Sequence, residues 1–274
     1  MTREEQLEFC KRCTFRKMDM KQGLICNLRG QKATFQDECP DYEVDKKIIH
    51  DEKKKIEAIR PNKKRAEIAQ ALIWLVMLLE IISMISSYFQ YDLLLALQRD
   101  EFVSNQIIDS NDIRESVIAI LYMIVYVVSA ITFIQWFRRA YYNMNIRTRT
   151  VHSDGWAAGS WFVPIISLYR PYQIMKEMCT ETSKLIKTKA GNSTNDSTVI
   201  IGIWWTLWII SNYVGQYVMR SAFKAETVEN FLNSTIGDMI QSSIGIPLAI
   251  ITVMIIKSYS AKEEMISEIE SKIE

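Results

Sequence analysis

VIAILYMIVYVVSAITFIQWF, residues 117–137, contains no charged side chain, and neither does VIIGIWWTLWIISNYVGQYVM, residues 199–219. Each run is 21 residues long. A helix of about 20 apolar residues is long enough to cross a hydrocarbon core of roughly 30 Å. Both runs therefore predict transmembrane helices, and they indicate an all-α integral membrane protein rather than a soluble enzyme.

Two further apolar stretches complete a set of four predicted spans. The stretch 67–88 is interrupted in its middle by the charged residue Glu80, and the stretch 239–256 is uncharged. We expect these spans to lie in a membrane domain that covers residues 66–260. The predicted spans are about 67–88, 116–137, 199–219 and 239–256.

Basic side chains are unevenly distributed, although the net charge is only +1. Of the 33 Lys and Arg residues, 17 precede residue 66 and nine lie within residues 138–198, whereas residues 89–115 carry only two. Loops rich in Lys and Arg stay on the cytoplasmic side of the membrane. Both termini and the segment 138–198 are therefore predicted to be cytoplasmic, and the charged N-terminus lacks the features of a signal peptide.

Residues 155–190 are predicted to form a re-entrant or amphipathic region. The uncharged stretch 155–169 has only 15 residues and contains Pro164, so it is too short to span alone. We expect it to re-enter the membrane or to lie at the interface, with its Trp and Tyr side chains at the level of the headgroups. Those side chains are Trp156, Trp161 and Tyr169.

Pro171 is expected to open an amphipathic helix, because proline is favoured in the first turn. We predict that this helix lies along the inner membrane surface with its apolar side toward the lipid. That side consists of Ile174, Met175, Met178, Leu185 and Ile186.

The N-terminal 40 residues contain four of the five cysteines, in the pattern Cys10-x2-Cys13-x12-Cys26-x12-Cys39. A C-x2-C pair with two further thiolates suits the tetrahedral S4 shell that zinc prefers, and four protein ligands make a site structural rather than catalytic. So short a segment buries too little apolar surface to fold alone, so a metal would stabilise it. Residues 1–40 are thus predicted to be a zinc-knuckle-like head. Iron, an iron–sulfur cluster and redox-active or incidental thiols remain alternatives.

Two charged segments flank the membrane domain. Residues 41–65 are predicted to contain an amphipathic linker helix followed by a basic membrane flank, and residues 261–274 a cytoplasmic helical tail. The apolar side of each segment is a candidate surface for a cytoplasmic protein partner or a second copy of the chain. The balanced net charge does not favour a nucleic-acid partner.

Glu80 is the one ionisable residue deep inside a predicted span. Such residues are costly and mark a relay or pathway, or they are satisfied by a hydrogen bond from a neighbouring helix. The pathway reading, with residues 155–169 lining the path, predicts a small oligomeric transporter or channel. A third reading is a lipid-modifying enzyme that uses His152 and Asp154, although the sequence contains no established catalytic motif and we assign no catalytic residue.

Several motifs after the second span resemble a bacterial membrane-protein family known as domain of unknown function 4328. They are QWFRRAYYN at 135–143, GWA at 155–157, GSWFVPI at 159–165 and Arg-Pro-Tyr at 170–172. The resemblance covers roughly residues 66–260 and implies no activity. Its motif residues are Trp136, Arg139, Tyr141, Asn143, Trp156, Trp161, Pro164, Pro171 and Tyr172.

The cysteine segment also resembles an N-terminal module found on membrane proteins of Bacteroidota, through its C-x2-C pair, RKMD at 16–19 and GLIC at 23–26. Together the two resemblances imply a bacterial inner-membrane protein with a metal-binding head. The expected function is non-enzymatic: the four spans anchor a cytoplasmic head that holds a structural zinc ion and recruits or senses a partner.

Overall fold

The computed structural model describes residues 2–191 and 198–271. The chain divides into two compact units, with the boundary between Ile59 and Arg60. We call the first the head unit and the second the membrane unit. The head unit contains helix α1 (Arg3–Arg12), strands β1 (Arg16–Asp19) and β2 (Gly23–Cys26), and helix α2 (Lys46–Glu57).

Local sequence signals explain the elements of the head unit. Thr2 and Glu5 form a capping box at the start of α1, and the side chain of Asp45 caps α2. Between β1 and β2, Asp19 Oδ1 accepts hydrogen bonds from the next turn residues and Gly23 has a φ of 77°, so the chain reverses into an antiparallel hairpin. No strand was predicted from the sequence in this segment.

The membrane unit is all-α, and four of its helices within the described residues are long and apolar enough to cross a membrane. Each of the four predicted spans therefore lies within a helix of this kind. These helices are α3 (Lys63–Gln98), α4 (Asn105–Arg147), α7 (Thr198–Ala222) and α8 (Val228–Ser271). The unit also contains α5 (Gly155–Gly159), the 3-10 turn η1 (Ile166–Leu168) and α6 (Arg170–Ala190).

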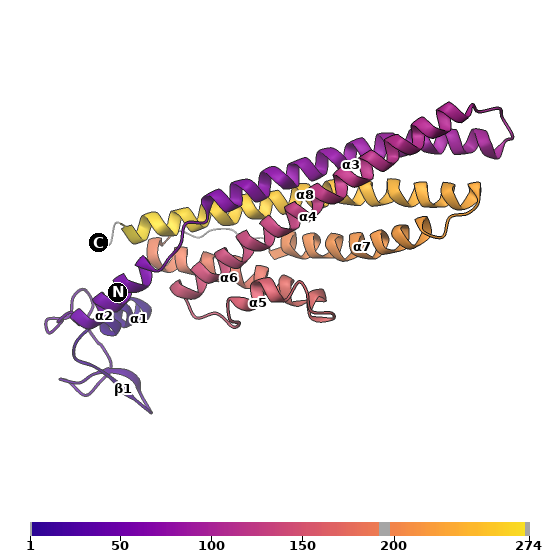
Figure 1. Ribbon diagram of the computed structural model, residues 1–274. Coiled ribbons are helices and arrows are strands. Elements are labelled where there is room, and N and C mark those ends of the chain that lie inside the picture. The colour runs from indigo at the N-terminus through magenta and orange to yellow at the C-terminus, as the bar shows by residue number, and fades with distance from the viewer. Residues whose placement is uncertain (1, 192–197, 272–274) are drawn as a thin grey trace. The chain divides into compact units, whose positions relative to one another are not determined.

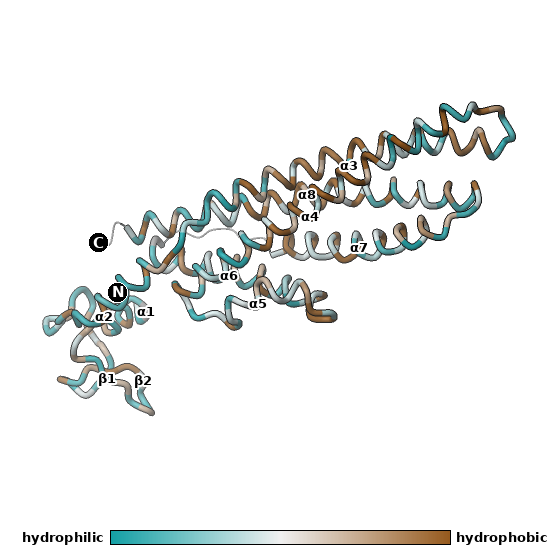
Figure 2. The backbone as a smooth tube through the Cα atoms, viewed as in Figure 1, coloured by the Kyte–Doolittle hydropathy of each residue, from teal (hydrophilic) through white to brown (hydrophobic). Residues whose placement is uncertain are grey.

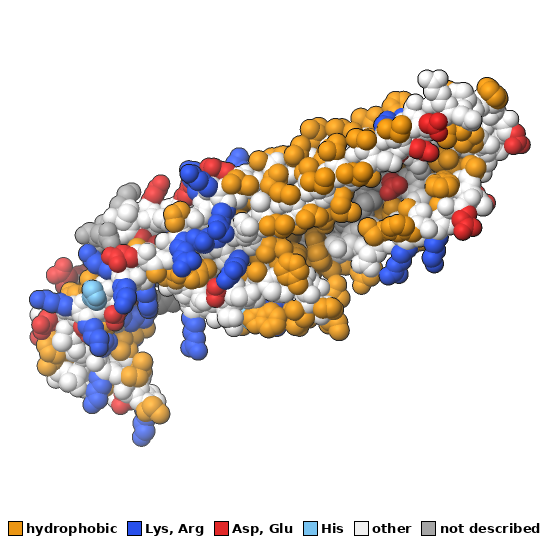
Figure 3. Space-filling model, viewed as in Figure 1, with side chains coloured by type: hydrophobic (Ala, Val, Ile, Leu, Met, Phe, Trp, Pro, Cys, Tyr) orange, Lys and Arg blue, Asp and Glu red, His pale blue; other side chains and the backbone are white. Residues whose placement is uncertain are grey.

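Helix α8 packs against α3, α7 and α6, and α3 also packs against α4 (Figure 1). The middle of these long helices is apolar and their ends are more polar (Figure 2). Large apolar side chains on α3 and α4, such as Ile85 and Ile120, point outward, and Figure 3 shows orange side chains over much of the face in view. An exposed apolar surface of this extent indicates a lipid environment.

The connector between the first two spans is much shorter than the sequence suggests. The predicted polar stretch 89–115 is almost entirely helical, and only residues 99–104 join α3 to α4. Polar side chains in this stretch bond to the neighbouring helix: Ser86 Oγ donates to Glu115 at 2.6 Å, and Gln90 donates to Thr235 at 3.2 Å. These bonds let the helices continue beyond their uncharged segments.

Helix α6 differs from the prediction in the surface that it covers. It has Pro171 in its first turn, as expected, and it is capped by Gly191, whose φ is 70°. However, Ile174, Met175 and Met178 are fully buried within the protein. The prediction that this side faces lipid is therefore wrong, because α6 packs against α8, α7 and α4 instead.

The stretch 155–169 forms the short helix α5 and the turn η1, with no helix long enough to cross. Trp156 and Tyr169 are exposed at its surface, about 40% each. Trp161 differs from the expectation of a headgroup contact, because its ring packs on Phe133 and Trp208.

The C-terminal residues are helical, as predicted, but they continue α8 through Ser271 rather than form a separate tail. Ile266, expected on a docking surface, is buried in the membrane unit. The tail is therefore part of the packed unit.

Candidate functional site

The four cysteines of the head unit line one pocket. Cys10 lies on α1, Cys13 directly follows that helix, Cys26 ends β2, and Cys39 lies in the loop before α2. All four are free thiols, and Cys13 is buried while the others are half-buried. Burial, together with the nearby thiols of the other three cysteines, raises the pKa of Cys10. A cation bound between the four thiols would stabilise them in their thiolate form.

Contacts between the loop and α1 explain how Cys39 approaches Cys10. Gln6 Nε2 donates to the Phe35 carbonyl at 2.6 Å, and the Phe9 ring meets the rings of Phe35 and Tyr42 edge to face. An ion pair of 2.6 Å between Arg29 and Asp41 closes the other side of the loop. The loop is thus held over the helix that carries the C-x2-C pair.

The four thiols are not arranged in the structure as the coordination shell of a metal ion. Among residues 2–191 and 198–271, no group of three or more His, Cys, Asp or Glu side chains is arranged to hold a metal ion. The donor set nevertheless suits zinc, because soft thiolates select that ion. The predicted ligands therefore share a cavity, and zinc itself stays a prediction.

Glu80 lies on α3 and is only 4% exposed. Tyr122 Oη on α4 donates to Glu80 Oε1 at 2.6 Å, and Ser242 on α8 also bonds to this carboxyl group. A Cβ atom on Gly245 would lie 2.6 Å from Oε1, so α8 approaches the carboxyl group closely at this glycine. Glu80 is therefore enclosed by three helices and hydrogen-bonded to two of them.

Further polar groups lie toward the α3–α4 connector. Arg114 donates to Ser86 Oγ at 2.8 Å and to Asn111 Oδ1 at 2.6 Å, and Asp238 interacts electrostatically with Glu115 and Glu80. In the described part of the chain, no hydrogen bond or ion pair joins Glu80 to residues 155–169. Among these described residues, the two parts of the predicted pathway thus make no polar contact with each other.

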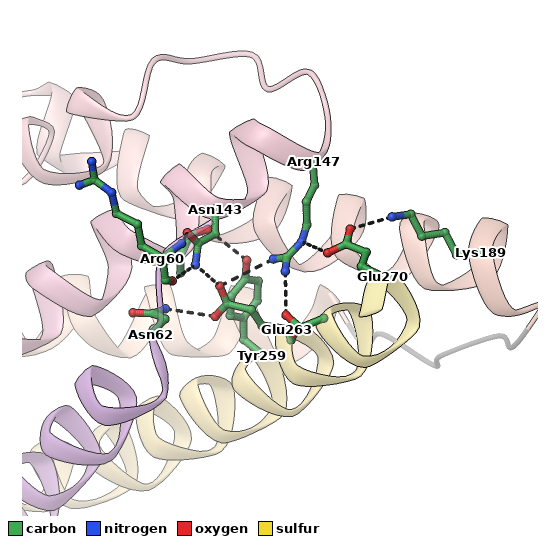
Figure 4. A network of polar contacts seen from close by, with 10 residues as sticks. Arg60, Asn62, Asn143, Arg147, Lys189, Tyr259, Glu263 and Glu270 are labelled. Carbon is green, nitrogen blue, oxygen red and sulfur yellow. Dashed lines mark hydrogen bonds and ion pairs between the residues drawn. The ribbon is translucent and has the colours of Figure 1, made fainter. Parts of the chain in front are cut away.

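A second polar network joins the start of α3, the end of α4 and the end of α8 (Figure 4). Asn143 Nδ2 donates to the Arg60 carbonyl at 2.8 Å and to Glu263 Oε1 at 2.6 Å, while its Oδ1 accepts from Arg60 N at 3.1 Å. Asn62 Nδ2 donates to the other Glu263 oxygen at 3.1 Å. Asn143 therefore holds three segments together with one side chain.

The same network continues along α8. Arg147 Nε lies 3.1 Å from Glu270 Oε2, and both side chains are only 4% exposed. Arg147 also donates to Ser267 Oγ at 2.8 Å, and Lys189 of α6 bonds to Glu270 at 2.7 Å. These partners satisfy charges that would be costly to bury alone.

Residues 99–261 match the family described as Domain of unknown function (DUF4328), which is more than half of the chain. The chain belongs to the DUF4328 family. The predicted family resemblance is confirmed, whereas the cysteine module lies outside the matched residues and its resemblance remains a prediction. No curated protein and no solved structure matches the chain.

The polar DUF4328 motif residues on α4 have different roles. Asn143 is the centre of the network described above. Tyr141 Oη donates to Glu177 Oε2 at 2.8 Å and accepts from His152 N at 3.1 Å, so it holds the loop after α4. Arg139 is half-buried and makes no ion pair among the described residues.

The aromatic DUF4328 motif residues are mostly packing residues. Trp136 is fully buried against Phe133 and Tyr259. Trp161 joins the α4 side chains to Trp208 of α7, and the Tyr172 ring lies 6.4 Å from that of Trp205. These side chains hold α4, α6 and α7 together.

The two motif prolines act on the backbone between α5 and α6. Pro164 precedes Ile165, whose φ of 67° lies in the left-handed region, and Pro171 lies in the first turn of α6. Trp156 of the same motif contacts the guanidinium of Arg170 at 5.8 Å. The motif thus directs the chain back toward α6.

His152 and Asp154 do not form a catalytic arrangement with a nucleophile. Arg170 Nη1 lies 2.7 Å from His152 Nε2, and no hydrogen bond or ion pair joins His152 to Asp154 in the described residues. Burial first, and then the charge of Arg170, lower the pKa of His152. The His152 ring is therefore an acceptor for Arg170 in its neutral form.

This pKa shift predicts a pH dependence of stability. The folded state disfavours protonation of His152, whereas the unfolded chain does not. The contribution of neutral His152 to the free energy of unfolding is therefore fully present above the unfolded-state pKa of about 6.5, and it is lost as the pH falls below that value. We expect the melting temperature of wild type to fall more steeply below about pH 6.5 than that of His152→Gln. Parallel pH profiles for the two proteins would contradict this assignment.

Sequence reasoning missed the acidic partners in these networks. Glu263 and Glu270 are seven residues apart, which places both on one face of α8. In a helical tail predicted to be cytoplasmic, that spacing of acidic residues is ordinary. Only the apolar neighbours of Glu263 on the same face signal that it is buried.

Proposed function

We propose that the protein is a bacterial inner-membrane anchor whose cytoplasmic head binds one structural zinc ion and recruits or senses a protein partner. Cys10, Cys13, Cys26 and Cys39 are the proposed ligands. Both termini lie on the cytoplasmic side in this proposal, in agreement with the distribution of basic residues.

The observation that carries the proposal is the convergence of the four cysteines. They are spread over 30 residues of sequence and come from a helix, a strand and two loops, yet they line one pocket. Zinc binding would draw the thiolate sulfurs together and replace their mutual repulsion with bonds to the ion.

Size is a second argument for a metal. Among the described residues of the head unit, only Cys13 and Ile25 are buried apolar side chains. A small unit with so few buried apolar side chains needs a further source of stability, such as a metal, disulfides or a partner. A bound zinc ion would therefore supply much of the folding free energy of the head.

The role that follows is binding rather than catalysis. Four sulfur ligands leave no open coordination position for a substrate, so the zinc would stabilise a surface instead of activating water. Such a surface, held at the membrane, is suited to recruiting a cytoplasmic protein.

The experiment compares proteins co-purified with the full-length chain in mild detergent, from cells that express wild type or Cys13→Ser. Cys179→Ser is the matched control, because that thiol lies on α6 in the membrane unit. We expect at least one cytoplasmic protein to be retained by wild type and the control and lost with Cys13→Ser. Identical sets from all three proteins would contradict a recruiting role of the head.

A proton or cation pathway through the membrane unit is the second candidate function. The observation that favours it is Glu80, which is almost fully buried between α3, α4 and α8 with Asp238 and Glu115 farther along. Buried carboxyl groups of this kind serve as relay sites in transporters.

Ion flux into liposomes tests this second candidate. We expect Glu80→Gln, which keeps the size and hydrogen-bonding capacity of the side chain, to reduce proton or sodium flux at least tenfold if Glu80 is a relay. Glu67→Gln, an exposed change on the same helix, is the control. Equal flux for wild type and Glu80→Gln would leave Glu80 with a structural role.

A further inference from the structure

Four arginines from three segments of the membrane unit lie close together. Arg60 precedes α3, Arg65 lies in its first turn, and Arg138 and Arg139 lie near the end of α4. The guanidinium of Arg139 interacts electrostatically with those of the other three. None of the four makes an ion pair with another described residue. The cluster therefore carries four positive charges without a carboxylate partner.

Contacts that do not neutralise these charges hold the arginines in place. Asn143 binds both backbone polar groups of Arg60, whose guanidinium lies over the Tyr142 ring at 4.9 Å. Arg65 Nη1 donates to the Gln135 carbonyl at 3.1 Å. Like charges kept near one another in this way repel, so an anion bound between them would be favoured.

The cluster borders the apolar surface of the membrane unit. Ile68, one turn beyond Arg65, is 52% exposed, and Ile131, two turns before Arg138, is 50% exposed. In Figure 3, blue side chains gather beside the orange surface near the start of α3 and the end of α4. A ligand that fits both surfaces has an anionic headgroup attached to an apolar chain.

We propose that Arg60, Arg65, Arg138 and Arg139 bind the phosphate group of an anionic phospholipid. Guanidinium groups match phosphate because they donate two parallel hydrogen bonds to its oxygens. The neighbouring isoleucines then contact the acyl chains. In this arrangement Arg139 contacts the phosphate, and Asn143 positions Arg60.

The experiment is native mass spectrometry of the full-length protein in detergent, titrated with phosphatidylglycerol or phosphatidylcholine. We expect wild type to prefer phosphatidylglycerol and Arg65→Gln/Arg139→Gln to bind it roughly 25-fold more weakly, since each basic residue near an anionic surface contributes about fivefold. Arg220→Gln/Lys224→Gln removes the same charge at the other end of the spans and should change binding less than about twofold.

Two further measurements distinguish a loss of lipid binding from a loss of folding, and lipid binding from phosphate binding. Arg138→Gln alters one exposed side chain without a hydrogen-bond partner, so a roughly fivefold loss there shows that binding, and not folding, is affected. Inorganic phosphate, added as a competitor, should not displace the lipid. Unchanged lipid binding by the double variant, equal losses in the control, or full displacement by inorganic phosphate would overturn the proposal.

Discussion

The Cys10→Ser/Cys13→Ser variant is expected to lose the folded head while the membrane unit stays intact. Zinc binding contributes about 10–16 kcal/mol to the folding of small zinc modules. The head unit has little else to replace this free energy, because its buried apolar side chains among the described residues are Cys13 and Ile25. We therefore expect the effect to be complete rather than graded.

Limited proteolysis of the full-length protein in detergent measures this loss. Cleavage of the variant should occur within residues 3–59, where the basic residues become accessible to trypsin, and a fragment containing α3 to α8 should persist. Cys179→Ser should behave as wild type, because burial raises the pKa of Cys179 to about 11 and keeps this thiol neutral. A protease-resistant head in the double variant would contradict a metal-dependent fold.

Asn143→Ala is expected to destabilise the membrane unit by about 3 kcal/mol or more. The substitution removes the Asn143 hydrogen bonds to a Glu263 oxygen and to both backbone groups of Arg60, and each unsatisfied buried group costs about 1–3 kcal/mol. Glu263 then keeps Asn62 and the more distant Arg147, whose Nη1 lies 3.9 Å away.

The unfolding of the purified protein in denaturing detergent, followed by tryptophan fluorescence, measures this change. Asn145→Ala is the matched control, because Asn145 lies two residues farther along α4 and is exposed. The control should unfold as wild type does. If the two alanine variants unfold at the same detergent concentration, the network around Asn143 does not stabilise the unit.

The spans could be predicted because their signal is local. An uncharged run of 21 residues has one stable form in lipid, so residues 117–137 and 199–219 indicate their helices without knowledge of the rest of the chain. The ends of the same helices depend on long-range pairing. Ser86 meets Glu115 only after α3 and α4 have packed, so the helical continuation through residues 89–115 is not visible in the sequence.

The environment of α6 is also a long-range property. An amphipathic helix looks the same in sequence whether lipid or protein covers its apolar side. Met175 is buried because α6 packs against other helices of the unit, a contact that no local pattern records.

The candidate sites show the same difference between local sequence signals and long-range contacts. The cysteine pattern predicted four residues that share a pocket, because ligand spacing is a local signal. The roles of Tyr141 and Asn143 were not predictable, since their partners Glu177 and Glu263 lie 36 and 120 residues away in the chain. The resemblance to the family identified these two positions but did not say what their side chains do. The hydrogen bonds to Glu177 and Glu263 show their structural roles.

The metal content of the purified protein tests the central claim most directly. The full-length chain would be purified in detergent without a metal-affinity column and measured by elemental mass spectrometry, beside Cys10→Ser/Cys13→Ser prepared in the same way. We predict about one zinc ion per chain in wild type and none in the variant, as expected for one S4 site. A wild-type chain without zinc, or zinc retained equally by the variant, would contradict the account.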